Sequence, residues 1–437
     1  MSKIFSNLFI LLVLSTLIVG CGSDEVLTSI PVEESGQESE PLLSQEVKTE
    51  VPAVADTWWK TYEGSGDNEV FDILLAEDGG LYMLGATNVR YEPERHADLC
   101  LIRIDSEGEV LWERTYGSHM FGQSITFTAD GNLLIAGVTM LGDAGFDAYL
   151  LKTDTEGNSL WAKTLSGPLD EWIHTVQQTS DGGFILFGNS VDPNDFITDP
   201  SVAGYGGFEG RSNILLIKTN EMGEEVWRQV YESKDNILST SGVQMPDGGY
   251  AVAASILYFP EPGDNLLLLK LDENGEEVWS RTWEEGRTNA RDMILTSNGE
   301  LLIITLFSAS GDPTEGDADL LITKVDEEGE EIWSTLHGEP EMVELGSALA
   351  ETSDGSYIIV GDKTRDLHRS SSDMILVKVS KEGQVVWEKN VISAPHFMIT
   401  GVTEHKAGGS FLVASVHWGY AVDILMVKTD AQGEVDE

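Results

Sequence analysis

Short apolar runs separated by glycine-containing turns follow one another along the chain from residue 57 onward. Residues 183–188 and 266–269 are two such runs, and both are shorter than the helices that usually bury a core. Apolar runs of this length between turn residues predict β-strands. The runs made only of Leu, Ile or Val predict strands that are covered on both faces.

The turns show that the chain is built from seven copies of one repeat, each about fifty residues long. One turn, usually with Asp or Asn before the glycine, is centred on Gly79, Gly131, Gly182, Gly248, Gly299, Gly355 and Gly408. A second turn is centred on Gly108, Gly157, Gly223, Gly275, Gly329, Gly383 and Gly433. Glycine after Asp or Asn suits the positive φ of a tight hairpin, so each repeat is predicted to hold two hairpins and four strands.

Two further features position the third and fourth strands. The third strand has Asp or Asn five residues before a basic residue, as in Asp319 and Lys324. A tryptophan lies four residues beyond the second turn glycine at Trp112, Trp161, Trp227, Trp279, Trp333 and Trp387. We interpret these tryptophans as wedges between successive outer strands, because large aromatic rings fill the widening gap between radiating sheets.

The two ends of the repeat array complement each other. The seventh copy stops at Glu437, four residues past Gly433, where a tryptophan and an outer strand should begin. Residues 58–62, with the sequence Trp-Trp-Lys-Thr-Tyr, match the outer strand at residues 112–116. An N-terminal strand that completes the last sheet would close a ring and remove a free edge. The predicted fold of residues 57–437 is therefore all-β, a seven-bladed β-propeller of four-stranded blades.

The Asp-x-x-Gly-x-x-x-Trp element resembles the tryptophan-docking repeat of quinoprotein-like propellers, a superfamily that includes the lipoprotein propeller of the outer-membrane barrel-assembly machinery. The whole repeat, with its Asp-Gly-Gly turn and Asp-x-x-Leu-Ile-x-Lys strand, resembles more closely the mostly uncharacterised repeat propellers of bacterial and archaeal surface lipoproteins. The likeness covers residues 57–437. It implies the fold and says little about function, because one propeller fold hosts many functions.

The N-terminus carries export signals. Residues 1–20 predict a lipoprotein signal peptide, with Lys3 followed by an apolar stretch at residues 4–19. Ile18-Val19-Gly20-Cys21 resembles the lipobox of bacterial lipoproteins, which implies that the thiol of Cys21 carries the lipid. A plain secretory signal with an incidental cysteine is the alternative.

Residues 21–56 contain mostly Ser, Glu, Pro and Gln without an apolar period, and so predict a disordered acidic tether after the lipidated cysteine. The expected localisation is export followed by lipid anchoring to the cell membrane. An outer membrane is favoured if the cell has one, because Gly22 and Ser23 provide no Asp-type retention signal. With Cys21 acylated no intramolecular disulfide is possible, and Cys100, in the apolar run 99–102, is predicted to be a core residue.

The composition and the motifs exclude several kinds of chemistry. A formal charge of -49 opposes binding to phosphate backbones, so nucleic acid is not an expected partner. Seven blades and a single cysteine in the body disfavour quinone-dependent catalysis, and the turns lack the spacing of the sialidase box. The chain has no His-x-x-x-His or Cys-x-x-Cys spacing, so no metal and no cofactor is predicted. The Asp-rich turns could bind calcium, but capping of the bend explains their recurrence better.

The two turn families lie on one face of the predicted ring, and the other connections lie on the opposite face, here called the loop face. Seven of the eight histidines, and seven of the eleven arginines, fall on the loop face or at the very start of an inner strand. Because Arg and aromatic residues dominate binding hot spots, this face is a candidate recognition surface for an anionic or sugar-like ligand. The candidate residues are Trp172, His119, His174, Arg287, Arg291, His396, His417 and Trp418.

One small polar position recurs seven residues before the first turn glycine and is predicted to line the channel near the loop face. It is occupied by Asp72, Ser124, Thr175, Ser241 and Asp292. Such residues at a crowded axis either line a ligand pocket or serve the structure, and the structural role is the commoner one.

These features lead to three functional hypotheses. The first is a monomeric, lipid-anchored scaffold of the cell envelope that binds a protein or glycan partner through the loop face. The second is an enzyme, a hydrolase or lyase acting on polysaccharide, with its site at the channel mouth around Asp72, His119, His174, Asp292 and His396. The third is a mechanical spacer with no specific partner.

Overall fold

The structure is a computed structural model. It describes residues 57–62, 68–90, 96–140, 145–196, 210–232, 236–257, 264–283, 287–308, 318–365, 372–394, 397–406, 408–418 and 421–435. Within these ranges every regular element is a β-strand, and none of the described residues forms a helix able to cross a membrane. The predicted signal peptide, the predicted lipid attachment site Cys21 and the predicted tether fall outside the described residues.

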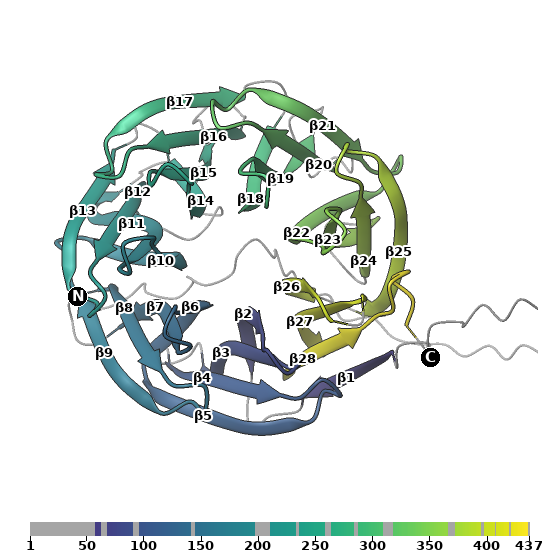
Figure 1. The fold of residues 1–437 in the computed structure, drawn as a ribbon, viewed down its shortest axis with the longest axis horizontal. Coiled ribbons are helices and arrows are strands. Elements are labelled where there is room, and N and C mark those ends of the chain that lie inside the picture. The colour runs from purple at the N-terminus through teal and green to yellow at the C-terminus, as the bar shows by residue number, and fades with distance from the viewer. Residues whose placement is uncertain are drawn as a thin grey trace, which may run out of the picture.

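Seven four-stranded antiparallel sheets surround a central axis (Figure 1). Blade 1 consists of β2 (Glu69–Leu75), β3 (Leu81–Arg90), β4 (His96–Ile104) and β5 (Val110–Ser118). Blade 2 consists of β6 (Met120–Phe127), β7 (Leu133–Thr139), β8 (Asp147–Thr153) and β9 (Ser159–Leu165). Blade 3 consists of β10 (Asp170–Gln178), β11 (Phe184–Phe196), β12 (Gly210–Thr219) and β13 (Glu225–Tyr231). Blade 4 consists of β14 (Asn236–Gln244), β15 (Tyr250–Leu257), β16 (Asp264–Leu271) and β17 (Glu277–Trp283).

The remaining three blades follow the same plan. Blade 5 consists of β18 (Arg287–Leu295), β19 (Leu301–Ser308), β20 (Ala318–Val325) and β21 (Glu331–His337). Blade 6 consists of β22 (Val343–Glu351), β23 (Tyr357–Thr364), β24 (Ser372–Val379) and β25 (Val385–Ala394). Blade 7 consists of β26 (Phe397–Glu404), β27 (Ser410–Trp418), β28 (Ala421–Lys428) and β1 (Trp58–Tyr62). In each blade the first strand is nearest the axis (Figure 1).

The ring closes as the sequence predicts. The N-terminal strand β1 pairs antiparallel with β28, from Trp58 opposite Lys428 to Tyr62 opposite Ile424. Blade 7 therefore has its outer strand from one end of the described chain and its other three strands from the opposite end. This pairing confirms both the number of blades and the identity of the closing strand.

The core lies between neighbouring blades. Second and third strands such as β7 and β8 are buried on both faces, as their continuous apolar runs predict. Cys100 is 3% exposed and packs within one of these interblade layers, which confirms its role as a core residue. Burial is the largest of the effects that raise the pKa of the Cys100 thiol. A raised thiol pKa is consistent with an inert side chain.

The tryptophan wedges are confirmed, and the structure shows what they contact. Each ring lies against the second turn glycine of the next blade. At Gly157, for example, an added Cβ would lie 2.9 Å from Cη2 of Trp112. Tyr116, in the same outer strand, donates its hydroxyl hydrogen bond to the Gly157 carbonyl at 2.8 Å. Glycine is required at this turn both for its φ of +78° and for the space that the indole occupies.

The turn aspartate and the basic residue of the third strand, noted separately in the sequence, form an ion pair. Lys218 Nζ lies 2.9 Å from Asp181 Oδ2, while Asp181 Oδ1 accepts the N–H of Gly183 at 3.0 Å. Five blades have this pair: Arg103–Asp78, Lys152–Asp130, Lys218–Asp181, Lys270–Asp247 and Lys378–Asp354. In blade 5, Lys324 pairs instead with Glu300, the residue after the turn glycine. The carboxylate thus caps the turn and holds a lysine or arginine, which accounts for the recurrence of acidic residues there without calcium.

Candidate functional site

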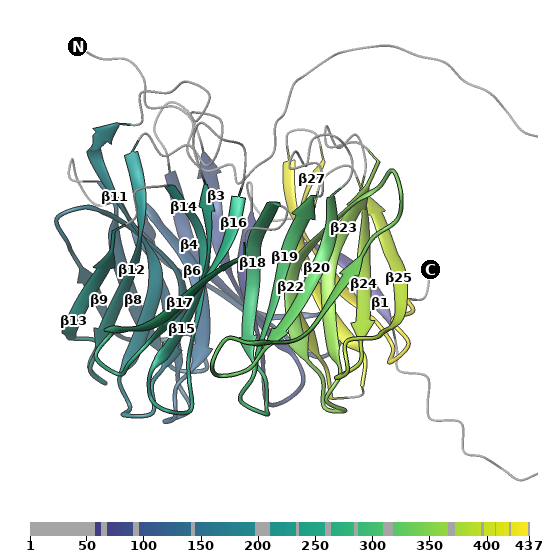
Figure 2. The same cartoon turned by 90° about the horizontal axis from the view of Figure 1, so that it is seen from above.

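The hairpins formed by the two turn families lie together on one face of the ring, here called the turn face (Figure 2). Every connection between first and second strands, and between third and fourth strands of blades 1 to 6, is five residues long, as at 76–80 and 105–109. Connections at the opposite ends of the strands vary from two residues (419–420) to thirteen (197–209) between second and third strands. Those between blades vary from a single residue, His119, to six. Variation in length is therefore confined to the loop face.

The inner strands extend further toward the loop face than the sequence suggested, and this corrects the position of two candidates. His174 lies inside β10 and Arg291 lies inside β18, so neither belongs to a connection. His119 is the single residue between β5 and β6, with a φ of +60°, and its carbonyl accepts the N–H of Met140 at 2.9 Å.

The remaining loop-face candidates are described only in part. Arg287 begins β18, and His417 and Trp418 end β27. Their side chains, and the whole of His396, lie outside the described residues.

Trp172 is predicted above to belong to the recognition surface, and its burial shows that this prediction is wrong. The side chain is 2% exposed, and its ring centroid lies 4.4 Å from that of Phe146 at an interplanar angle of 42°. Trp172 occupies β10, which is covered by blade 2, so its indole serves as interblade packing. A buried indole cannot contact a partner without opening the blades.

His174 is directed to a neighbour in its own blade. Its Nε2 lies 2.9 Å from Oδ1 of Asn189, a buried residue of β11. Burial lowers the pKa of the imidazole, while the hydrogen bond to Asn189 acts in the opposite direction. The result is a neutral, positioned histidine at neutral pH.

The recurring position in the inner strands joins each blade to the next. Asp72 of blade 1 accepts the N–H of Ile125 in blade 2 at 2.7 Å and its neighbour Ile73 at 2.8 Å. Asp292 of blade 5 likewise accepts the N–H of Leu349 in blade 6 at 3.1 Å and that of Met293 at 2.8 Å. Both oxygens of each carboxyl group are thus engaged by backbone, which is a structural use of these residues.

The serines at this position make the same kind of contact. Ser124 Oγ accepts the N–H of Val176 in blade 3 at 3.3 Å, and Ser241 Oγ donates to the carbonyl of Met293 in blade 5 at 3.4 Å. Thr175 occupies the equivalent place in blade 3. The sequence found this position but did not show that it bridges blades.

Burial changes the acidity of both carboxyl groups. It raises the pKa of Asp72 to about 7, although hydrogen bonds from Ile125, Ile73 and Ser124 oppose it, and the negative charge of Asp292 adds to the increase. Burial raises the pKa of Asp292 to about 6 against the hydrogen bonds from Leu349, Met293 and Ser241. Burial thus moves the pKa values of both carboxyl groups from the usual acidic range toward neutrality.

A β-bulge precedes this bridging position in each inner strand. The register shifts fall between 70 and 72, 122 and 124, 173 and 175, 238 and 240, 290 and 292, 346 and 348, and 399 and 401. Bulges turn side chains away from the regular alternation of a strand. Thr400 uses this change to donate its hydroxyl to the Val70 carbonyl of blade 1 at 2.8 Å, and Phe71 uses it to pack on Phe121 of blade 2.

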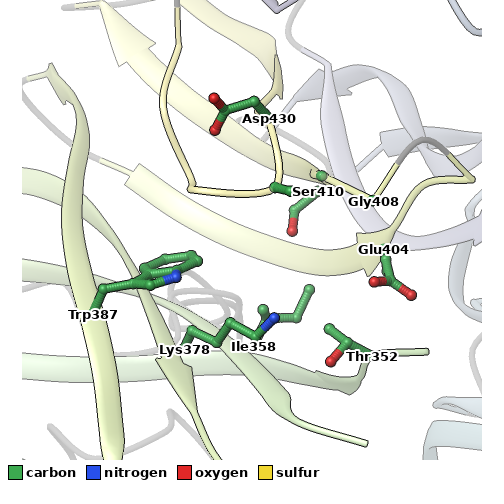
Figure 3. A pocket seen from close by; sticks show the side chains of 10 residues that line it. Thr352, Ile358, Lys378, Trp387, Glu404, Gly408, Ser410 and Asp430 are labelled. Atoms are coloured by element: carbon green, nitrogen blue, oxygen red, sulfur yellow. The ribbon is translucent and has the colours of Figure 1, made fainter. Parts of the chain in front are cut away.

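A shallow pocket on the turn face lies between blades 6 and 7 (Figure 3). Its lining includes Lys378, Trp387, Glu404 and Asp430. Lys378 is already paired with Asp354 at 2.8 Å, and Glu404 accepts the N–H of Ser353 at 2.7 Å. Lys378 is thus engaged within blade 6, and Glu404 joins blade 7 to blade 6, so both charged groups already have partners in the protein.

Within the described ranges, no group of three His, Cys, Asp or Glu side chains is arranged to hold a metal ion. Sequence reasoning also missed a cluster of buried charges where blades 5 and 6 meet at the loop face, formed around Lys363 and Glu344. The pattern that could have revealed it is the acidic residue eleven positions before the turn glycine, present as Glu171 in blade 3 and Glu344 in blade 6.

Comparisons with known proteins agree with the architecture. The family described as Outer membrane protein assembly factor BamB matches residues 213–400, a segment within blades 3 to 7 that fits quinoprotein-like propeller repeats. No curated protein matches the chain.

Three solved structures are reported as similar to the chain. A polysaccharide lyase of family PL25, an ulvan lyase, is 10% identical with a TM-score of 0.55, over 86% of this chain and 97% of that one. The WD40 domain of Toxoplasma gondii coronin is 9% identical with a TM-score of 0.49, over 88% and 90%. A protein of unknown function from Dyadobacter fermentans is 9% identical with a TM-score of 0.46, over 86% and 99%. At these identities the likeness shows the fold alone.

Proposed function

We propose that this protein is a binding scaffold of the cell envelope, held by a lipid on Cys21, that contacts a protein or glycan partner through the loop face of its propeller. The observation that carries the proposal is the contrast between the faces. Thirteen uniform hairpins form one face, and all variation in connection length is on the other. Binding surfaces are commonly built on variable connections supported by a rigid frame. The match to the BamB family favours an envelope setting.

The alternative of a polysaccharide hydrolase or lyase has less support from the described residues. Asp72, His174 and Asp292 belong to blades 1, 3 and 5, and each is engaged by a neighbouring backbone or side chain. A general acid and base must instead reach one substrate position. The ulvan lyase shares the fold, and a shared fold does not carry its activity to this chain.

Site-specific photocrosslinking on the full-length chain in intact envelopes tests the scaffold proposal. Crosslinking residues would replace the exposed loop-face positions Ser118, Ser166 and Glu232, with exposed turn-face positions Met222 and Glu382 as matched controls. The expected result is discrete adducts from the loop-face positions only. Adducts from the turn face alone, or equally from both faces, would overturn the proposal.

A Cys21→Ser variant tests the anchor separately. Loss of the lipid should release the chain from the membrane fraction, and the released chain should still crosslink its partner through loop-face positions if the partner is soluble or is added back. Retention of Cys21→Ser in the membrane fraction would contradict the anchor and leave the loop-face result to stand on its own.

A further inference from the structure

A cluster of ionisable side chains joins blades 5 and 6 near the loop face. His337 is the last residue of β21 in blade 5, and Glu339 follows it in the connection to blade 6. Glu344, Lys363 and Glu388 come from β22, β23 and β25 of blade 6. The cluster therefore crosses the junction of two blades, and we call it the seam cluster.

Lys363 is the centre of the seam cluster. Its ammonium group lies 2.8 Å from Glu339 Oε1, 3.0 Å from Glu388 Oε1 and 3.6 Å from Glu344 Oε1, and its side chain is 6% exposed. His337 Nε2 lies 2.7 Å from the other oxygen of Glu388. One lysine thus serves three carboxyl groups, so the cluster has surplus negative charge, and protonation of one carboxyl reduces that surplus.

Glu344 is the member that is least able to remain charged. It is fully buried, its Oε1 accepts the N–H of Glu339 at 3.0 Å, and its Oε2 is buried without a hydrogen-bond partner. Burial raises its pKa to about 7, the hydrogen bond from Glu339 and the charge of Lys363 oppose this, and the charges of Asp319 and Glu388 add to it. An orphaned carboxylate oxygen in the interior is costly, whereas a carboxylic acid at the same place is tolerated.

The equivalent place in blade 3 is balanced differently. Glu171 corresponds to Glu344, since both lie eleven residues before a turn glycine, and Arg228 corresponds to Glu388, since each follows a docking tryptophan. Arg228 pairs with Glu171 and also with Glu225 at 2.8 Å. Blade 3 therefore places a cation where blade 6 places an additional carboxylate, which makes the surplus charge specific to the junction of blades 5 and 6.

We propose that the seam cluster is a proton-controlled latch: with Glu344 protonated it holds the loop-side ends of blades 5 and 6 together, and loss of that proton loosens them. The groups that face Glu344 are Asp319 of β20, Glu388 of β25, Lys363 of β23 and Glu339 of the connection, with His337 of β21 acting through Glu388. Opening exposes Glu344 to water, where a carboxylate is stable.

The direction of the pH dependence follows from the folded and opened states. Glu344 binds its proton more tightly in the closed seam than in water, so the closed seam is favoured at low pH. Opening becomes easier as pH rises from about 4.5 toward about 7 and changes little above that. We expect the opening equilibrium to rise by at least about tenfold across this interval.

Hydrogen exchange on the full-length chain tests the latch between about pH 5 and about pH 8, after correction for the intrinsic pH dependence of exchange. In the wild type, amides of residues 339–347 should lose at least about tenfold protection as pH rises. Glu344→Gln, which mimics the protonated acid, should remove this dependence. Glu388→Gln, which removes a facing negative charge, should lower the pKa of Glu344 and so shift the midpoint of the loss of protection to lower pH.

The matched control is the segment 167–173 of blade 3, where Arg228 pairs with Glu171 and a smaller pH dependence than at residues 339–347 is expected. Wild-type protection that does not change with pH would overturn the latch. A Glu344→Gln variant that keeps the wild-type dependence would also overturn it. If Glu344→Gln does not fold, the wild-type profile and the Glu388→Gln shift decide the question without it.

Discussion

Trp58 lies against Gly108 across the point where the last blade meets the first, so that a Cβ added at Gly108 would lie 2.5 Å from the indole Cη2. The same contact recurs around the ring as Trp112–Gly157, Trp161–Gly223, Trp227–Gly275, Trp279–Gly329, Trp333–Gly383 and Trp387–Gly433. Seven tryptophan–glycine contacts therefore join seven blades, and the N-terminal strand supplies the one that seals the circle.

Gly108→Ala should destabilise the fold more than Gly131→Ala does. Both glycines have positive φ, +77° and +79°, so both substitutions strain the backbone by about 1 to 2 kcal/mol. Only Gly108 faces an indole, whereas a Cβ at Gly131 meets nothing within 4 Å. The further cost of overpacking is about 1 to 3 kcal/mol, measured as a difference in free energy of unfolding in urea. Equal losses for the two variants would show that the tryptophan contact contributes nothing.

Trp58→Ala should weaken ring closure, whereas Trp59→Ala should have little effect. Trp58 packs with the interblade core next to Phe411, at 6.0 Å between ring centroids, while Trp59 is 50% exposed. Loss of the half-buried indole should lower the free energy of unfolding by about 2 kcal/mol or more. The exposed residue should change it by about 0.5 kcal/mol or less, as for most surface substitutions. A larger loss of unfolding free energy for Trp59→Ala than for Trp58→Ala would mean that the opposite face of β1 packs against the ring.

The repeat explains why the fold could be predicted. The residue types of Trp112, Gly157 and Asp181 recur at the equivalent positions of most repeats. The same contact is therefore indicated several times along the sequence. Residues 58–62 match an outer strand, and the repeat that contains Gly433 lacks one, so the sequence also predicts how the ring closes. Single-copy features have no such redundancy. The burial of Trp172 depends on Phe146 in another blade, and no local pattern distinguishes it from an exposed tryptophan in a connection.

Trp172→Ala should destabilise the protein and not act as a local change in a contact surface. The indole is 2% exposed and packs on Phe146, so its removal leaves a cavity between blades 2 and 3. Loss of a buried tryptophan costs about 3 to 5 kcal/mol, which thermal or urea unfolding would detect. Arg365→Ala, at an exposed position at the end of β23, serves as the surface control and should change stability by about 0.5 kcal/mol or less.

The candidate site was harder to predict because the same residue types serve structure and chemistry. Asp72 and Asp292 have the residue type of catalytic acids and lie in the inner strands, but the partners that define their role are backbone N–H groups of another blade. Glu344 and Lys363 are ordinary surface residue types by sequence, and only the pairing of β22 with β23 brings them together in the interior. Long-range contacts of this kind are set by the packing of blades.

Asp181→Asn should lower stability at neutral pH and have less effect in acid. Burial acts to raise the pKa of Asp181, but hydrogen bonds from Thr179, Lys218 and Gly183 outweigh it and hold the pKa at about 2. The stabilisation is present above the unfolded pKa of 3.8 and is lost as pH falls toward 2. Since the side chain is 64% exposed, solvent screening limits the loss to about 1 kcal/mol or less. An equal loss at about pH 7 and about pH 3 would contradict the assignment of the ion pair.

Asp72→Asn should have the opposite pH signature. Burial raises the pKa of Asp72 from 3.8 to about 7 in the folded protein, so the native state holds a proton that the unfolded chain has released. Between about pH 4 and about pH 7 this group makes the folded state progressively less stable, and Asn, which is neutral throughout, removes that contribution. The wild type should therefore lose at least about 1 kcal/mol more than Asp72→Asn does between about pH 5 and about pH 8 in urea unfolding. Asp292→Asn should behave in the same way with a midpoint nearer 6. If both variants follow the wild-type profile, the carboxyl groups are ionised throughout, and the N–H groups of Ile125 and Leu349 stabilise the anions more strongly than burial opposes them.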